Sequence, residues 1–242
     1  MPIQTLQPQR LYRQIADQLR TLIRAGEFPV GSRLPPERDL AAKLGVSRPS
    51  VREALIALEV EGLVAVRMGS GIDVIAREPA ASAKKVDAAF GPFEIIRARQ
   101  LVECELAAQA AETMDAAQVQ GLRDALASMA ADVAQGRPPI RGDRQFHLAL
   151  AEAAGNGPLL RTVTELFDER NNPLFDQLGQ HFETGQTWRL ALAEHQAVID
   201  AIAAGQPDAA RAAMRAHLQN SHDRFAGTWP LSPSLQAASA GR

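Results

Sequence analysis

The sequence predicts a mainly α-helical fold that contains one small β hairpin. Apolar residues recur three and four positions apart through most of the chain, which is the spacing of one face of an α-helix. Alanine is abundant after residue 97, whereas the whole chain holds only eight Phe, two Trp and one Tyr. Only residues 63–66 and 72–75, on either side of a Gly-Ser-Gly segment, have the pattern of two paired strands.

The bulk composition indicates a cytoplasmic globular protein. Hydrophobic residues make up 46% and charged residues 22% of the chain, as in ordinary globular domains. No apolar stretch is long enough to cross a membrane, and the first residues lack the apolar segment of a signal peptide. One cysteine, Cys104, excludes an intramolecular disulfide and suits a reducing compartment.

Net charge says little about partners, because it is only −2. Residues 1–75 carry ten Lys and Arg against eight Asp and Glu, and the remainder carries sixteen against twenty. Basic character therefore lies slightly toward the N-terminus. The positions of the arginines must carry any argument for nucleic acid.

Three helices are expected before the hairpin. Residues 11–26 form an amphipathic helix, and a second helix opens at Pro35-Pro36 and ends at Gly45. Ser47 can cap a third helix that runs to Gly62. Two short helices joined by Leu-Gly-Val-Ser predict a helix-turn-helix, with the hairpin as its wing.

Polar residues at the start of the third helix indicate that it reads double-stranded DNA. Arg48, Ser50 and Arg52 lie in its N-terminal half, the end of a recognition helix that enters the major groove. Arginine can bind guanine O6 and N7 together, and serine suits phosphates or base edges. Any helix pair with surface arginines could look similar, so this pattern alone leaves a non-binding helix pair open.

The run PVGSRLPPERDLAAKLGVSRPSVREALIALEVEGLV resembles the signature of the GntR family of bacterial regulators, within a match from Leu11 to Val74. The resemblance implies that Glu37 and Glu53 make contacts within the protein. It implies the following DNA contacts and wing glycines: Arg38, Ser47, Arg48, Ser50, Arg52, Gly69 and Gly71.

Behind a winged helix-turn-helix domain of residues 1–75, we expect a linker at 76–90, an all-α domain at 91–228 and a flexible tail at 229–242. The all-α domain is expected to be a six-helix antiparallel bundle, because Gly and Pro divide this region into six periodic segments. The expected helices are 92–112, 115–135, 139–154, 157–182, 186–205 and 207–226.

Three histidines and one aspartate are expected to face the interior of this bundle. Asp143 and His147 lie four residues apart on one helix face, which also carries Ile140. His195 and His217 lie on apolar stripes of two other helices. A single inward histidine is usually a hydrogen-bonded core residue, but three histidines and a carboxylate suit a transition metal. His181 and His222 are interpreted as surface or packing residues.

These segments resemble the FCD effector domain of the FadR-type branch of the GntR family. In its metal-binding members an Asp and three His hold a divalent ion, which implies Asp143, His147, His195 and His217 as ligands here. Zinc is the first expectation, and nickel or manganese also fit this ligand set. The resemblance implies that Arg99 binds an effector carboxylate; the alternative is a surface pair with Glu103.

The segment 91–100 and the wing resemble hexuronate regulators of the UxuR/ExuR type, which implies a sugar-acid effector. Arg97 and Asn171 are further candidate effector contacts. The sequence leaves the orientation of both open, together with that of Asp168, Arg170 and Asn172.

The function predicted from these patterns is a homodimeric repressor that binds a palindromic operator and responds to a small carboxylate. Alternatives are a sensor of another organic acid (aldonate, dicarboxylate or lactate-like) and a metal-independent binder of fatty acyl ligands. A metal-dependent enzyme with a DNA-binding domain is a further alternative. We expect no enzyme, because the sequence shows no HExxH motif and no evident general base.

Overall fold

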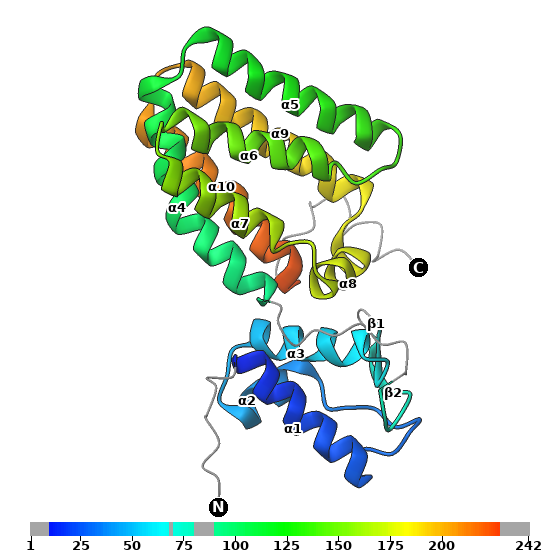
Figure 1. Ribbon diagram of the computed structural model, residues 1–242. Helices are drawn as coiled ribbons and strands as arrows, with labels where there is room; N and C mark the ends of the chain where they lie inside the picture. Colours follow the sequence, from blue (N-terminus) through cyan, green and yellow to red (C-terminus); the bar gives the residue numbers. More distant parts are fainter. Residues whose placement is uncertain (1–9, 68–69, 80–89, 228–242) are drawn as a thin grey trace, which may run out of the picture. The chain divides into compact units, whose positions relative to one another are not determined.

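The computed structural model describes residues 10–67, 70–79 and 90–227 (Figure 1). These residues separate into two compact units. The first takes the described residues up to Glu94 together with Glu169–His181, and the second takes Ile95–Asp168 and the described residues from Phe182 onward. Residues 169–181, which the sequence assigned to the all-α domain, therefore pack with the first unit. Most of the expected linker and the whole expected tail lie outside the described residues.

The first unit contains a winged helix-turn-helix, as predicted. Its elements are α1 (Leu11–Ala25), α2 (Glu37–Leu44), α3 (Arg48–Val60), β1 (Val64–Arg67) and β2 (Gly71–Val74). Buried side chains of α1 pack on α3, whose residues from Val51 to Leu58 are all buried.

Two local features fix the helix-turn-helix. Gly45 ends α2 in the left-handed region at φ 66°, a conformation that glycine adopts at little cost. Ser47 then caps α3, because its hydroxyl accepts the Ser50 backbone N–H at 3.3 Å. Both features confirm the expected helix ends.

The wing is an antiparallel hairpin in which Ala65 pairs with Asp73 and Arg67 pairs with Gly71. Arg33 forms an additional antiparallel bridge to Asp73. The segment before α2 thus lies along the free side of β2 and extends the two-stranded wing by a single bridge.

The C-terminal region is all helical. Its helices are α4 (Pro92–Thr113), α5 (Ala116–Ala134), α6 (Ile140–Ala153), α7 (Gly157–Asp168), α8 (Pro173–Phe182), α9 (Gly185–Ala203) and α10 (Pro207–Ala226). In the second unit α5 lies along α6 and α9, and α9 lies along α10 (Figure 1). None of the helices within the described residues combines the length and apolar character that a membrane crossing needs.

The single helix expected at 157–182 is wrong, because the structure divides it into α7 and α8. Asn172 caps the second helix: its Oδ1 accepts the backbone N–H groups of Leu174 and Phe175 at 2.9 and 3.1 Å. Pro173, which has no N–H, is the first residue of α8. The described bundle region therefore contains seven helices rather than six.

Apolar side chains from α4, α5, α6, α9 and α10 form one core cluster, which includes Phe146, Leu150, Val198, Met214 and Leu218. The expected inward position of Ile140 is wrong, since 52% of this residue is exposed at the start of α6.

Gly142 allows α6 to approach α5 closely. A Cβ atom at this position would lie 2.6 Å from Met129 Cγ and 2.8 Å from the Ala125 carbonyl oxygen. Gly142→Ala should therefore lower the free energy of unfolding by about 1–3 kcal/mol through overpacking, measured by urea denaturation. Gly121→Ala is the matched control, because its Cβ would meet no atom within 4 Å. Equal stability of the two variants would contradict this account of the packing.

Candidate metal centre and nucleic-acid interface

Four buried side chains from three helices meet inside the second unit. Asp143 and His147 come from α6, His195 from α9 and His217 from α10. One ligand atom from each lies within 4.8 Å of the others. The two α6 residues converge because they are one helical turn apart.

An oxygen atom lies beside the Nδ1 atom of each of the three histidines in this cluster. His195 Nδ1 lies 2.7 Å from the Ala191 carbonyl oxygen, and His217 Nδ1 lies 2.9 Å from Glu194 Oε2. His147 Nδ1 approaches Glu103 Oε2 at 2.6 Å. Outer oxygens of this kind favour a proton on Nδ1, which leaves Nε2 to bind a metal. Burial lowers the pKa of His147, but the Glu103 carboxylate outweighs it and raises this pKa, so a metal that binds here displaces a proton from Nε2.

The inner nitrogens support a metal site rather than a hydrogen-bonded core. His195 Nε2 lies 3.1 Å and His147 Nε2 lies 3.5 Å from Asp143 Oδ1. Among the described residues, however, His195 Nε2 and both ring nitrogens of His147 have no aligned hydrogen-bond partner. Buried polar atoms are normally satisfied, so the ligand set fits a divalent cation. Such an ion would act as a Lewis acid toward the oxygens of a bound carboxylate.

Arg99 and Glu103 form a buried ion pair beside this cluster. Arg99 Nε donates to Glu103 Oε1 at 2.7 Å, and the two residues are only 2% and 1% exposed. The Arg99 guanidinium also lies over the Phe167 ring, 5.0 Å from its centre. The pairing with Glu103 foreseen as an alternative is therefore present, but it lies in the interior and not on the helix surface.

Burial and charge shift two pKa values strongly. Burial would raise the pKa of Glu103, but the charges of Arg99 and His147 outweigh it and hold this pKa at about 2. For His217, burial and the neighbouring His195 lower the pKa to about 3. Glu103 is thus a carboxylate and His217 a neutral ligand near neutral pH.

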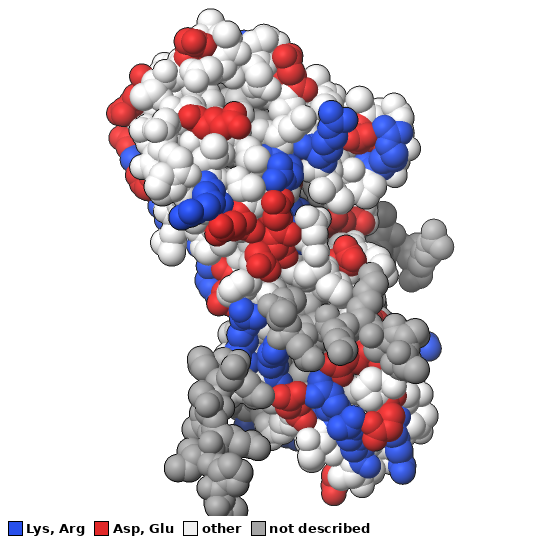
Figure 2. Space-filling model, viewed as in Figure 1, with Lys and Arg blue, Asp and Glu red and all other residues white. Residues whose placement is uncertain are grey.

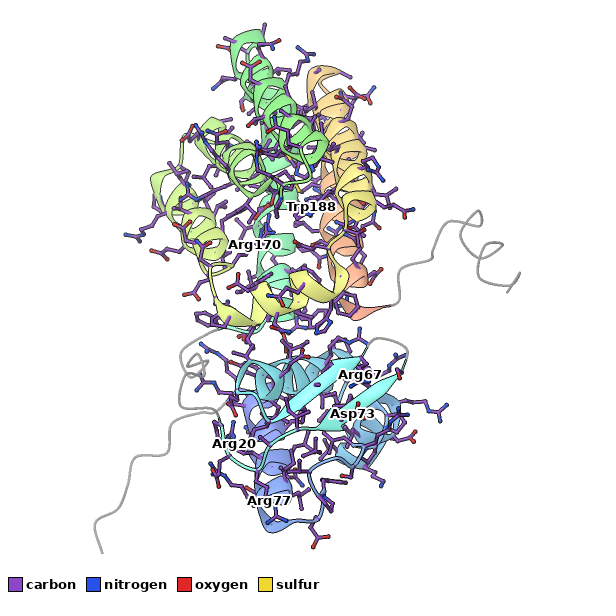
Figure 3. The ribbon with its side chains drawn as sticks, turned by 90° about the vertical axis from the view of Figure 1, so that its right-hand side faces the viewer. Arg20, Arg67, Asp73, Arg77, Arg170 and Trp188 are labelled. Atoms are coloured by element: carbon purple, nitrogen blue, oxygen red, sulfur yellow. The ribbon has the colours of Figure 1, made fainter. Side chains whose placement is uncertain are left out.

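Two other candidate effector contacts are at the surface. Arg97 and Asn171 are exposed, and Asn171 belongs to the first unit rather than to the unit with the histidines. Asp168 pairs with Arg144 at 2.8 Å. The Arg170 guanidinium, from the residue labelled in Figure 3, lies 5.7 Å from the Phe175 ring centre.

The two remaining histidines pair with carboxylates. His181 lies 2.6 Å from Glu59 Oε2, and His222 lies 3.0 Å from Asp223 Oδ1. Glu59 also accepts the Val66 N–H at 2.8 Å, so it connects α3, α8 and the wing within the first unit.

Several expected DNA contacts are exposed near the start of α2 and α3. Arg38 has 84% of its side chain exposed, while Ser47 and Arg48 are also exposed and Ser50 is half-buried. The Ser47 and Ser50 hydroxyls lie 2.8 Å apart. Figure 2 shows Lys and Arg side chains on this unit with acidic side chains between them.

Arg52 differs from the other expected contacts because it is buried. Its Nε donates to Glu37 Oε1 at 2.8 Å, and only 8% of its side chain is exposed. Sequence reasoning foresaw a role for Glu37 within the protein but did not connect the two residues. Gly71 lies at the start of β2 with φ 134°, and Gly69 lies outside the described residues.

Glu53 also acts within the protein. This residue is buried on α3, and its Oε1 accepts the Phe93 N–H at 2.9 Å at the first turn of α4. A side chain at Gly91 would collide with the same carboxylate, because its Cβ would lie 2.4 Å from Oε1.

Family models match both parts of the chain. Residues 11–74 match the model described as bacterial regulatory proteins, gntR family, and residues 94–220 match the FCD domain. The chain belongs to the GntR family. It is a DNA-binding regulator with an FCD domain, and FCD domains are known to bind metals.

Several known proteins are similar to the regulator over most of its length. The Uxu operon transcriptional regulator of Escherichia coli (strain K12) is 37% identical over 224 residues, covering 90% of this chain and 87% of its own. The Exu regulon transcriptional regulator of the same strain is 38% identical (88% and 84% covered). A putative L-lactate dehydrogenase operon regulatory protein, also from this strain, is 36% identical (89% and 86% covered). The solved structure of E. coli McbR/YncC shares the fold, with a TM-score of 0.50 and 21% identity (90% and 97% covered).

Glu194, which the sequence analysis did not single out, orients one of the candidate ligands. Its Oε2 accepts from His217 Nδ1, and its Oε1 accepts from Asn220 Nδ2 and Arg224 Nη1, each at 2.9 Å. The position of Glu194 directly before His195 was a signal for a role at the site. The histidine that it contacts, however, is His217, which lies on another helix.

Glu194→Gln should weaken metal binding by the regulator about 10- to 100-fold, because it removes the charge that orients the His217 ring. Competition with a metal-chelating dye measures this affinity. Gln196→Glu on the exposed side of α9 is the control. An unchanged affinity in Glu194→Gln would show that Glu194 does not support the site.

Proposed function

We propose that this regulator is a homodimeric repressor of a sugar-acid catabolic operon. Its affinity for a palindromic operator changes when a small carboxylate binds beside a divalent ion. Asp143, His147, His195 and His217 hold the ion, with zinc as the first expectation and nickel or manganese as alternatives. The protein acts in the cytoplasm, where the operator lies, and its metal serves binding rather than catalysis.

The convergence of one ligand atom from each of Asp143, His147, His195 and His217 carries this proposal. Imidazole rings whose outer nitrogens already lie beside oxygens supply the donors that a first-row divalent metal prefers. An Asp and three His leave coordination positions for effector oxygens. Arg99 places a positive charge beside the site, through its partner Glu103.

The relatives favour a hexuronate-type effector, because the Uxu and Exu regulators match the regulator at 37% and 38% identity. The lactate-operon relative at 36% identity favours a second candidate, a smaller hydroxy acid. Both candidates share a carboxylate and a hydroxyl, and both suit a site with a cation and an arginine. A functional dimer is expected because two winged helices related by a two-fold axis match a two-fold operator.

A thermal-shift screen tests the sensor function. Uronates, aldonates, dicarboxylates and lactate are added to metal-loaded and chelated protein, and the expected result is stabilisation by one class of acid only when metal is present. The same acid should change the affinity for DNA upstream of the neighbouring genes in a fluorescence titration. Equal stabilisation with and without metal would overturn the metal-dependent sensor. Absence of sequence-selective DNA binding would overturn the regulator.

A further inference from the structure

Two arginines of the wing are held on either side of one aspartate. Arg33 Nε donates to Asp73 Oδ1 at 3.3 Å, and Arg67 Nε lies 3.3 Å from Asp73 Oδ2. Figure 3 labels Arg67 and Asp73 on the two strands of the hairpin. Each oxygen of the carboxylate therefore faces a different guanidinium.

The backbone of the wing creates this arrangement. Arg33 forms its backbone bridge with Asp73 of β2. Arg67 of β1 pairs with Gly71, which lies two residues before Asp73 on β2. Alternate residues of a strand face the same side, so Gly71 and Asp73 share one face. The Arg33 side chain lies over Gly71, since a Cβ at that position would be in ordinary contact with Arg33 Cδ at 3.7 Å.

Folding alone gives little reason for this cluster. Arg33 and Arg67 have 64% and 68% of their side chains exposed, and exposed ion pairs stabilise proteins by only about 0–1 kcal/mol. Two positive charges against one negative leave a net positive charge on the wing face. Each guanidinium has five N–H donors, and Asp73 occupies only part of this set.

We propose that Arg33 and Arg67 form a two-arginine phosphate clamp, positioned by Asp73, that binds the DNA backbone beside the recognition helix. This inference rests on the DNA-binding part of the proposed function and is independent of metal and effector. Guanidinium groups match phosphate oxygens in geometry, and a shared carboxylate holds both long side chains in place before DNA binds.

Salt dependence of binding tests the clamp. Arg33→Gln and Arg67→Gln should each reduce the magnitude of the slope of log K against log salt by about 0.9, and the double variant by about twice that. Between 50 and 200 mM salt, the affinity ratio of wild type to either single variant should therefore shrink roughly three- to fourfold. The loss should be uniform across operator and unrelated DNA.

Asp73→Asn separates positioning from simple repulsion. In the wild-type background it should weaken DNA binding, because the two guanidinium groups are no longer held. In the Arg33→Gln/Arg67→Gln background it should strengthen binding, because only repulsion of phosphate remains. Stronger binding in both backgrounds would overturn the positioning role of Asp73.

Arg161→Gln is the matched control, since this arginine is 76% exposed on α7 in the other unit. If wild type binds DNA but the Arg33→Gln and Arg67→Gln variants have the same salt slope as the Arg161→Gln control, the clamp is overturned. The proposed function would remain intact. A loss confined to the operator sequence would overturn backbone contact in favour of base reading. Far-UV circular dichroism confirms that each variant is folded.

Discussion

Replacing His195 by alanine is expected to abolish stoichiometric metal binding. The side chain is fully buried, and its Nε2 atom faces Asp143 at 3.1 Å. Its removal leaves two imidazoles and one carboxylate and takes away the ring that faces Asp143, so the affinity should fall far enough for the ion to be lost during purification with a chelator. Elemental analysis of the purified protein should give about one ion per chain for wild type and a small residual fraction for the variant.

Stability provides a second measurement. A ligand present at 100 times its Kd stabilises the folded state by about 2.7 kcal/mol, so a chelator should lower the Tm of wild type but leave that of His195→Ala unchanged. His222→Ala is the control, since His222 pairs with Asp223 on the same helix as His217. Full metal content in His195→Ala would refute the assignment of the ligands.

Replacing Glu103 by glutamine should destabilise the protein by about 3–5 kcal/mol. Breaking a buried ion pair by removing one partner leaves an uncompensated charge in the interior, and Arg99 is only 2% exposed. The free energy of unfolding from urea titration measures the loss.

Replacing both partners separates charge from packing. Arg99→Met/Glu103→Leu should recover most of the stability, since well-packed apolar pairs often substitute for buried ion pairs at no cost. The same double variant should lose its response to the carboxylate effector. A loss of less than 1 kcal/mol in Glu103→Gln would show that the pair contributes little to the fold.

The low pKa of Glu103 makes its contribution depend on pH. The carboxyl has a pKa of about 2 in the folded protein, against an ordinary value of 4.5. The stabilisation is therefore fully present above pH 4.5 and is lost as the pH falls toward 2. The stability difference between metal-free wild type and Glu103→Gln should shrink over this range by about 3 kcal/mol. A difference that stays constant with pH would contradict the ionised state of Glu103.

Local patterns in the sequence predicted most of the fold. The cap at Ser47, the left-handed Gly45 and the glycine-flanked hairpin each depend on neighbouring residues, and each lies where the sequence placed it. The convergence of Asp143, His147, His195 and His217 could also be foreseen, because helical periodicity decides which side chains face inward.

Interactions between distant segments were harder to foresee. Arg52 has the spacing of a DNA-reading residue, but its partner Glu37 lies fifteen positions earlier on another helix. Glu194 binds His217, which is 23 residues away. The break between α7 and α8 had a local signal in Asn171-Asn172-Pro173, but the apolar periodicity on both sides obscured it.

The outer oxygens beside Nδ1 of the three histidines bear on whether the site is formed before an ion binds. Oxygens of Ala191 and Glu194 hold the His195 and His217 rings from outside, and a Glu103 oxygen lies beside His147 Nδ1. All three histidines are buried. We expect such a site to be preorganised, so that a cation binds with little reordering of the chain. In zinc fingers, by contrast, the ion drives folding. Here we expect the domain to fold without the ion and to bind it reversibly, so that its loading follows the supply of metal.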